Sequence, residues 1–292
     1  MSQKLARTAL IYDFDGTLAR GNLQERSFIP SIGMENQSFW DEVKARTKAH
    51  DADEILMYMH VMLEKARIRN LPITKDQLRS CGKDAQLFDG LKDGAWFERI
   101  NDHARDRGLA LEHYIVSSGI HEMIAGCPIY DQFKGVFASK FIYENDTALW
   151  PGVGINYTSK TQYLFRINKG IENHWDNDSI NAYMPEEERP IPFSRMIFFG
   201  DGETDVPAMK MITYKGGHSV AVYDDKRTDK DLDKIHRLIS DGRVEFVAPG
   251  DYLEKSQLDI IVKGLIGRIA RRNGYRPPIK SGQPRVAETA QQ

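Results

Sequence analysis

The carboxylates with the most informative spacing in this 292-residue chain lie in two short runs. The first run reads DFDGT at residues 13–17, and the second reads GDGETD at residues 200–205. Their four aspartates would repel one another unless a cation or a basic side chain lay among them. Hard oxygen ligands suit Mg²⁺ or Ca²⁺, and Mg²⁺ typically combines one or two carboxylates with waters and a substrate phosphate. The spacing therefore indicates metal-assisted chemistry on a phosphorylated compound.

Each aspartate run follows a short apolar segment, and such segments recur along the chain. We expect strands at residues 8–12, 113–117, 196–199, 219–223 and 244–248. Helical patterns separate most of them, which predicts an α/β fold with a mainly parallel sheet. In such sheets the working loops lie beyond the carboxyl ends of the strands. Both aspartate runs and the pair Ser117-Ser118 are therefore expected to meet at one edge of the sheet.

The segment 20–110 differs from the rest because it is rich in helix-forming residues. We expect helices there at residues 40–49, 52–68, 74–80 and 95–107. In the second of these, Ile55, Met59, Met62 and Ala66 recur at three- and four-residue steps, which indicates an amphipathic helix. The expected domains are an α/β core from residues 1–19 and 111–272 and a helical insertion at 20–110.

Local signals predict the remaining elements. A β-hairpin is expected from residues 136–143 and a return strand near Leu149, because Asn145-Asp146 favours a tight turn. A helix is expected at 160–168, after the capping residue type Ser159. Further expectations are a surface loop at 171–192, helices at 229–240 and 253–271, and a flexible basic tail at 273–292.

In order and spacing these motifs resemble those of the haloacid dehalogenase (HAD) superfamily. The DFDGT run is similar to the first motif of the family, the apolar run that ends in Ser117 to the second, and the GDG triplet with Asp205 to the fourth. Lys160 is similar to the third motif and is preferred over its rivals, Lys140 and Lys169, because it opens a helix ahead of a strand. The helical insertion resembles the C1-type cap of the phosphoserine-phosphatase-like branch.

The resemblance implies a fold and a reaction. The fold would be a Rossmann-like, mainly parallel sheet with helices on both faces and a cap inserted after the first strand. The reaction would be Mg²⁺-dependent hydrolysis of a small phosphomonoester through a phosphoaspartate on Asp13, with Asp15 as general acid and base. Ser117, Ser118 and Lys160 would bind the phosphoryl group.

The resemblance also implies a ligand set for Mg²⁺. The metal would be held by Asp13, the backbone carbonyl of Asp15, and Asp201. Asp205 would bind the metal through water or orient Lys160, which would also act as a catalytic residue by holding charge near the nucleophile.

Asp15 separates the reaction types known in the family. A halide needs no proton to leave, and dehalogenases of the family lack an acid at this position, so the acid favours phosphate ester chemistry. Two alternatives stay open. One is a phosphotransferase or mutase with the same intermediate, and the other is a binding protein on a catalytically retired fold.

The residues that would recognise the substrate depart from those of phosphoserine phosphatases. Glu25 is the one acid in the stretch 20–25, and Thr204 stands where asparagine is common, which argues against phosphoserine itself. Lys44, Arg46 and Lys48 are candidate contacts for an anionic substrate, with a solvated helix face as the alternative.

Composition limits the classes of partner. Lys plus Arg is 40 and Asp plus Glu is 42, so a formal net charge of −2 argues against a protein that coats nucleic acid or an anionic membrane. Two cysteines, Cys81 and Cys127, cannot form a disulfide framework, and no apolar run is long enough to span a bilayer. We expect a cytoplasmic protein that binds a small phosphorylated metabolite. The near-neutral total conceals an acidic segment at 171–190 and a basic one at 268–292.

Overall fold

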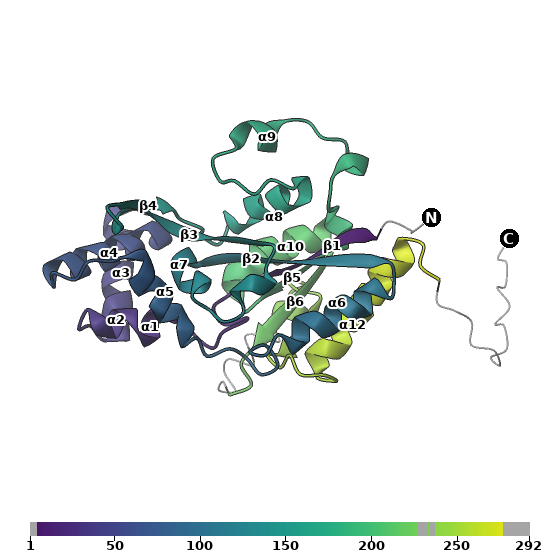
Figure 1. The fold of residues 1–292 in the computed structure, drawn as a ribbon, viewed down its shortest axis with the longest axis horizontal. Helices are drawn as coiled ribbons and strands as arrows, with labels where there is room; N and C mark the ends of the chain where they lie inside the picture. Colours follow the sequence, from purple (N-terminus) through teal and green to yellow (C-terminus); the bar gives the residue numbers. More distant parts are fainter. Residues whose placement is uncertain (1–4, 227–232, 234–236, 277–292) are drawn as a thin grey trace.

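The computed structural model describes residues 5–226, 233 and 237–276, and it is built around one seven-stranded sheet of order β4-β3-β2-β1-β5-β6-β7 (Figure 1). The strands are β1 (Ala6–Tyr12), β2 (Leu109–Ile120), β3 (Gly135–Glu144), β4 (Thr147–Val153), β5 (Met196–Gly200), β6 (His218–Tyr223) and β7 (Phe246–Pro249). Neighbouring strands are parallel except for β3 and β4, which pair antiparallel. The predicted α/β class with a mainly parallel sheet is confirmed.

Helices cover both faces of the sheet because successive residues of a strand point to opposite sides. Ala9 and Ile11 of β1 pack in the core formed with α8 (Lys160–Lys169) and α10 (Val206–Tyr214). Leu10 and Tyr12 point the other way and pack in the core formed with α6 (Ala95–Arg105) and α12 (Gln257–Arg272). All four side chains are fully buried. The strand that leads into the first aspartate run is therefore fixed by packing on both sides.

Five helices between β1 and β2 gather at one end of the sheet, and together they are called the cap below (Figure 1). They are α1 (Leu23–Arg26), α2 (Phe28–Ser31), α3 (Asn36–His50), α4 (Glu54–Ile68) and α5 (Lys75–Lys83). In α4 the buried residues include Ile55, Met59, Met62 and Ala66, the positions at which the sequence predicted an apolar stripe.

Helix α6 differs from the sequence interpretation because it packs on the sheet and not in the cap. Trp96, Phe97 and Ile100 are fully buried in the core shared with α12, and the helix contacts β2 and α12 directly. Its apolar face needs a large apolar partner, which the sheet provides. The inserted range 20–110 is therefore longer than the cap, whose last helix is α5.

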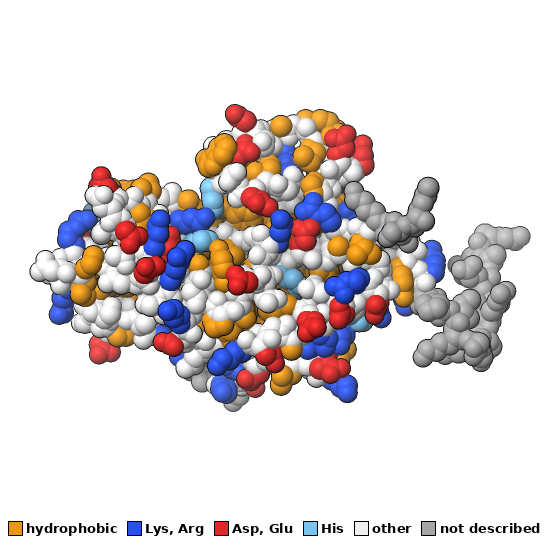
Figure 2. All heavy atoms as spheres, viewed as in Figure 1, with side chains coloured by type: hydrophobic (Ala, Val, Ile, Leu, Met, Phe, Trp, Pro, Cys, Tyr) orange, Lys and Arg blue, Asp and Glu red, His pale blue; other side chains and the backbone are white. Residues whose placement is uncertain are grey.

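Two surface features agree with the sequence expectations. Asn145 and Asp146 form the turn between β3 and β4 with positive φ angles of 48° and 63°, a conformation that these residue types tolerate well. The segment 171–192 projects beside α8 and contains only the short helix α9 (Asn177–Asn181) and turns of 3₁₀ type (Figure 1). Acidic side chains lie on this projection in Figure 2.

Two other expectations concern residues mostly outside the described part of the chain, namely the helix at 229–240 and the tail at 273–292. The final helix expected at 253–271 is present as α12, and α7 (His121–Ala125) follows β2. Among the described residues no helix has both the length and the apolar character needed to cross a membrane.

Candidate active site

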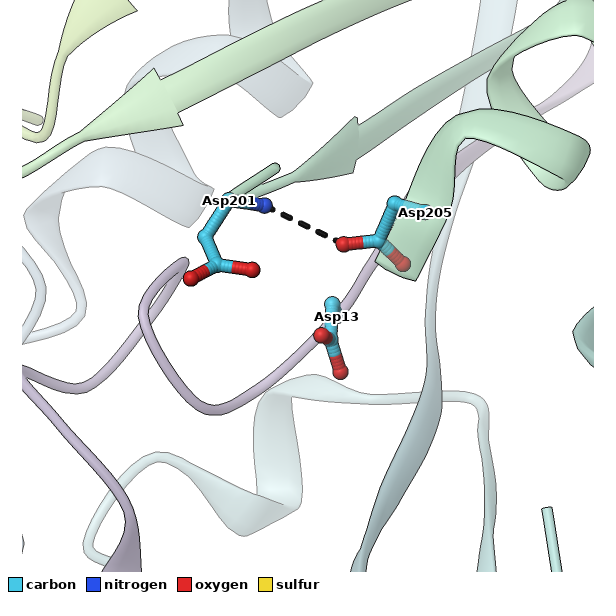
Figure 3. Close-up of side chains that lie close together, drawn as sticks. All are labelled: Asp13, Asp201 and Asp205. Atoms are coloured by element: carbon cyan, nitrogen blue, oxygen red, sulfur yellow. Dashed lines mark hydrogen bonds between the residues drawn. The ribbon is translucent and has the colours of Figure 1, made fainter. Parts of the chain in front are cut away.

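The carboxyl ends of two adjacent strands, β1 and β5, bring the predicted aspartates together. Asp13 follows β1, Asp201 follows β5, and Asp205 ends the 3₁₀ turn just before α10. One carboxylate oxygen of each lies within 4.8 Å of the others, as the close-up shows (Figure 3). Residues nearly two hundred positions apart in the sequence meet here because β1 and β5 are parallel neighbours.

Lys160 lies between two of these aspartates. Its ammonium is 2.9 Å from Asp13 Oδ2 and 2.7 Å from Asp205 Oδ1, and its side chain is only 1% exposed. Burial alone disfavours an ammonium, but the carboxylates of Asp13 and Asp205 outweigh it and raise the pKa of Lys160 above its usual range. The rival Lys169 instead donates to the carbonyls of Ile180 and Ala182 on the projecting segment.

Both carboxylate oxygens of Asp205 have donors. Oδ1 accepts from Lys160, and Oδ2 accepts from the backbone N–H of Asp201 at 3.1 Å (Figure 3). Asp205 is fully buried. Because both oxygens already accept hydrogen bonds, Asp205 is better suited to orient Lys160 and the backbone of Asp201 than to bind a metal directly.

Asp15 lies across the site from Lys160 and is held by the backbone. The N–H of Leu23, at the start of α1, donates to Asp15 Oδ1 at 3.2 Å. Removal of the carboxyl from water, and then the charge of Asp13, raise the pKa of Asp15 to about 8. The chain turns at Gly16, where φ is +74° and where an added Cβ would lie 2.3 Å from Asp201 Oδ2. Glycine is therefore required for the first aspartate run to pass the second.

The residues Ser117 and Ser118 border the aspartates from β2. Ser117 is fully buried, and its Oγ accepts from the backbone N–H of Gly119 at 3.1 Å. The Ser118 hydroxyl is buried and has no hydrogen-bond partner among the described residues. The Ser118 carbonyl accepts from the hydroxyls of Tyr58 at 2.7 Å and Ser139 at 3.0 Å. The loop is thus fixed while one hydroxyl stays available for a ligand.

A cavity of about 380 Å³ opens above these residues. Asp13, Asp15, Ser117, Ser118, Lys160 and Asp201 form its floor, and residues of the cap form its roof. The roof includes Gln24, Glu25, Trp40, Lys44, Glu54 and Tyr58. A cavity of this size lies within the range of small-molecule sites.

The roof contains polar groups of two kinds. Glu25 Oε1 accepts from Trp40 Nε1 at 2.7 Å and from Asn22 Nδ2 at 2.6 Å, so this acid helps to order the roof. Gln24 is 4% exposed, and its Oε1 has no partner within the described part of the chain. Such an orphaned buried acceptor is uncommon and indicates a place where a ligand donor or a water binds.

The three basic side chains of α3 that were candidates to contact an anionic substrate differ in their surroundings. Lys44 lines the cavity and forms no ion pair with the described residues. Arg46 is held by Glu42 and Glu64, and Lys48 is exposed and does not line the cavity. Of the three candidates for an anionic substrate, the structure leaves Lys44.

The donor set at the floor fits Mg²⁺. Asp13 and Asp201 offer hard carboxylate oxygens on neighbouring strand ends, within 4.8 Å of one another. Mg²⁺ prefers such ligands and keeps several waters, for which the open cavity leaves room.

The sequence did not indicate the contacts that three residues make near the site. The sequence motifs include none of Gln24, Tyr58 and Asn156. Tyr58 is 2% exposed, its hydroxyl donates to the Ser118 carbonyl, and the residue lines the cavity. The spacing of apolar residues predicts that a position is buried, but it does not show which partner a polar atom of that side chain will bind.

Comparisons with known proteins agree with the geometry. The sequence profile of the family described as haloacid dehalogenase-like hydrolase matches residues 10–210. A protein of Borreliella burgdorferi described only as uncharacterized is 27% identical over 288 residues, which cover 88% of this chain and 96% of that protein.

Solved structures show the same fold at low identity. A HAD family hydrolase from Salmonella enterica serovar Typhi superposes with a TM-score of 0.55 at 16% identity, covering 90% of this chain and 72% of the other. A substrate-bound phosphoserine phosphatase superposes with a TM-score of 0.53 at 15% identity, covering 89% and 98%. A probable phosphoserine phosphatase from Vibrio cholerae gives 0.56 at 11% identity, covering 93% and 69%.

Proposed function

Because the chain belongs to the haloacid dehalogenase-like hydrolase family, we propose that it is a Mg²⁺-dependent phosphatase that hydrolyses a small phosphomonoester through a phosphoaspartate on Asp13. The observation that carries the proposal is the buried ammonium of Lys160, 2.9 Å from Asp13 and 2.7 Å from Asp205, beneath an open cavity. An enzyme that attacks a dianionic phosphate with a carboxylate needs a fixed positive charge at that place.

In the first step an oxygen of Asp13 attacks phosphorus and the bond from phosphorus to the ester oxygen breaks. Asp15 gives its proton to the departing oxygen, which leaves as an alcohol. The two carboxyl groups are two residues apart, and the turn at Gly16 keeps both on the cavity side. This step divides one difficult displacement into two easier ones.

In the second step a water molecule attacks the phosphorus of the phosphoaspartate. Asp15, now ionised, accepts a proton from that water, and the bond from phosphorus to Asp13 breaks. Inorganic phosphate leaves, Asp13 returns as a carboxylate, and Asp15 is protonated again. The roof of the cavity limits the access of bulk water during this sequence.

The phosphoryl oxygens are held by donors of the floor. Ser117, Ser118 and Lys160 line the cavity beside Asp13. Asp13, the backbone carbonyl of Asp15, and Asp201 would hold Mg²⁺, which supplies positive charge against the phosphoryl oxygens when bound. Asp205 keeps Lys160 in place through the contact described above.

The proposal is tested with a panel of phosphometabolites and p-nitrophenyl phosphate at neutral pH, with Mg²⁺ and with EDTA. We expect Mg²⁺-dependent release of phosphate, and for Asp13→Asn a loss of at least about 10³-fold in kcat with the fold retained. A folded Asp13→Asn variant that still hydrolyses the aryl phosphate at the wild-type rate contradicts the proposal. Transfer of phosphate to an added alcohol far above the share of that alcohol in the solvent would instead identify a phosphotransferase.

A further inference from the structure

Asn156 organises the turn that begins helix α8. Its Oδ1 accepts from the backbone N–H groups of Thr158 at 3.2 Å and Ser159 at 2.8 Å. Its backbone carbonyl accepts from the N–H of Lys160 at 3.1 Å. The position at which the helix starts, and hence the origin of the Lys160 side chain, depends on this turn.

The other end of the same amide reaches the cap. Asn156 Nδ2 donates to Asp53 Oδ2 at 2.6 Å, across a sequence separation of 103 residues. Asp53 is the N-cap of α4, and its Oδ1 accepts from the backbone N–H of Leu56 at 2.9 Å. One side chain therefore joins the start of the cap helix α4 to the start of the helix that carries Lys160.

Helix α4 contacts the floor at two more points. The Tyr58 hydroxyl donates to the carbonyl of Ser118 at 2.7 Å, and the Tyr157 hydroxyl donates to Glu54 Oε2 at 3.1 Å. The first contact lies beside the phosphate-binding serines, and the second lies in the turn before Lys160. The amino-terminal half of α4 thus touches both groups that are to hold the phosphoryl oxygens.

We propose that Asn156 is a positioning residue that couples the docking of α4 on the core to the placement of Lys160. The inference rests on the proposed function only for the role of Lys160; the link between cap and turn stands on its own contacts. When α4 is docked, the Asn156 amide is held at both ends and the turn is fixed. When α4 is displaced, the Asn156 amide loses its hydrogen bond to the Asp53 carboxylate, and the turn is no longer held from the cap side. Lys160 is therefore best placed only when α4 is docked over the cavity.

The bond between these two side chains can be broken and then rebuilt in the opposite direction. In Asn156→Asp the new carboxylate faces the carboxylate of Asp53. In Asp53→Asn the new amide faces the amide of Asn156. In the double variant, Asp53→Asn with Asn156→Asp, an amide again faces a carboxylate. Both variant side chains keep the oxygen that accepts the local backbone N–H groups, so the helix cap and the turn retain their own bonds.

The experiment measures kcat and KM for p-nitrophenyl phosphate with Mg²⁺, together with hydrogen exchange of the Thr158 and Ser159 amides. We expect each single variant to lower kcat about tenfold, with KM within about twofold, and to speed the exchange, because a hydrogen bond to a charged group is lost. The double variant restores both quantities to within about threefold of wild type. Asp176→Asn, at the N-cap of α9 on the projecting segment, is the matched control because its side chain has no bond to the turn before Lys160, and it leaves both unchanged.

Two results overturn the coupling: single variants that keep the wild-type kcat and exchange, or a double variant as impaired as the worse single variant. A wild-type protein without phosphatase activity refutes the proposed function and not the link. In that case the exchange of the Thr158 and Ser159 amides decides, since it must rise in Asp53→Asn and recover in the double variant.

Discussion

The floor and the roof of the cavity differ in how their polar groups are satisfied. On the floor, Lys160 is shared between Asp13 and Asp205, and Asp205 has a donor for each oxygen. On the roof, Gln24 Oε1 and the Lys44 ammonium have no partner among the described residues. The charged network of Lys160, Asp13 and Asp205 on the floor is paired within the protein, although the Ser118 hydroxyl beside it has no partner among the described residues, whereas Gln24 and Lys44 of the roof leave polar groups that a ligand can satisfy.

This difference separates chemistry from recognition. Groups that must act on any phosphate are held on strand ends between two packed helical layers, where buried charges are paired. Under the proposed function, the groups that contact the rest of the substrate lie on helices of the cap, and those that form no bond to the floor, such as Lys44, can change without disturbing it. Substitutions in the floor should therefore alter kcat and stability together, and substitutions of roof side chains that form no bond to the floor, such as Lys44, should alter KM.

The largest effect on the floor is expected for Lys160→Met. The change leaves two buried carboxylates without their shared cation, so we expect kcat to fall at least about 100-fold and the free energy of unfolding to fall by about 3 kcal/mol. Steady-state kinetics and urea unfolding measure the two effects. The control is Lys169→Met on the same helix, and equal losses in both variants would contradict the special role of Lys160.

The next largest effect is expected for Gly16→Ala, compared with Gly21→Ala. Both glycines have a positive φ, +74° and +70°, so both variants pay about 1 kcal/mol of backbone strain. Only at residue 16 would the new Cβ meet Asp201, at 2.3 Å, whereas residue 21 has nothing within 4 Å. We expect the Mg²⁺ concentration for half-maximal activity to rise about tenfold or more in Gly16→Ala alone. A similar rise in Gly21→Ala would assign the effect to strain.

A smaller effect is expected in the roof for Lys44→Ala, compared with Lys48→Ala. Lys44 lines the cavity and Lys48 does not, although both are exposed on α3. We expect KM for an anionic substrate to rise about fivefold in the first variant, with kcat unchanged, since an exposed charge contributes about 1 kcal/mol. Added salt should reduce the difference. Unchanged KM in both variants would show that the lysine faces solvent.

The smallest effect should come from Arg46→Ala, which removes the ion pairs from Arg46 to Glu42 and Glu64. The pair with Glu64 joins α3 to α4, and the pair with Glu42 lies within α3; all three side chains are partly exposed. We expect unchanged kinetics and a loss of about 1 kcal/mol in the free energy of unfolding. Arg105→Ala removes a local, exposed pair on α6 and should cost about 0.3 kcal/mol. A change in KM for Arg46→Ala would extend the recognition surface beyond Lys44.

Much of the fold followed from local patterns in the sequence. Buried apolar runs predicted the strands, a three- and four-residue step predicted the buried face of α4, and Asn145-Asp146 predicted the hairpin. The position of α6 could not be predicted from the sequence, because the apolar face of an amphipathic helix does not show which surface it will pack against. Trp96 and Phe97 would suit a cap interior as well as the sheet on which they pack.

The sequence by itself determined the two aspartate runs and their place after strands, since residue type and strand order bring parallel strand ends to one edge. It also favoured Lys160 among three lysines. Only the tertiary structure decided that its ammonium lies between Asp13 and Asp205, that Lys44 and Gln24 line the roof, and that Asn156 meets Asp53. These contacts join residues distant in the chain. Their geometry depends on how helices pack, which local composition does not encode.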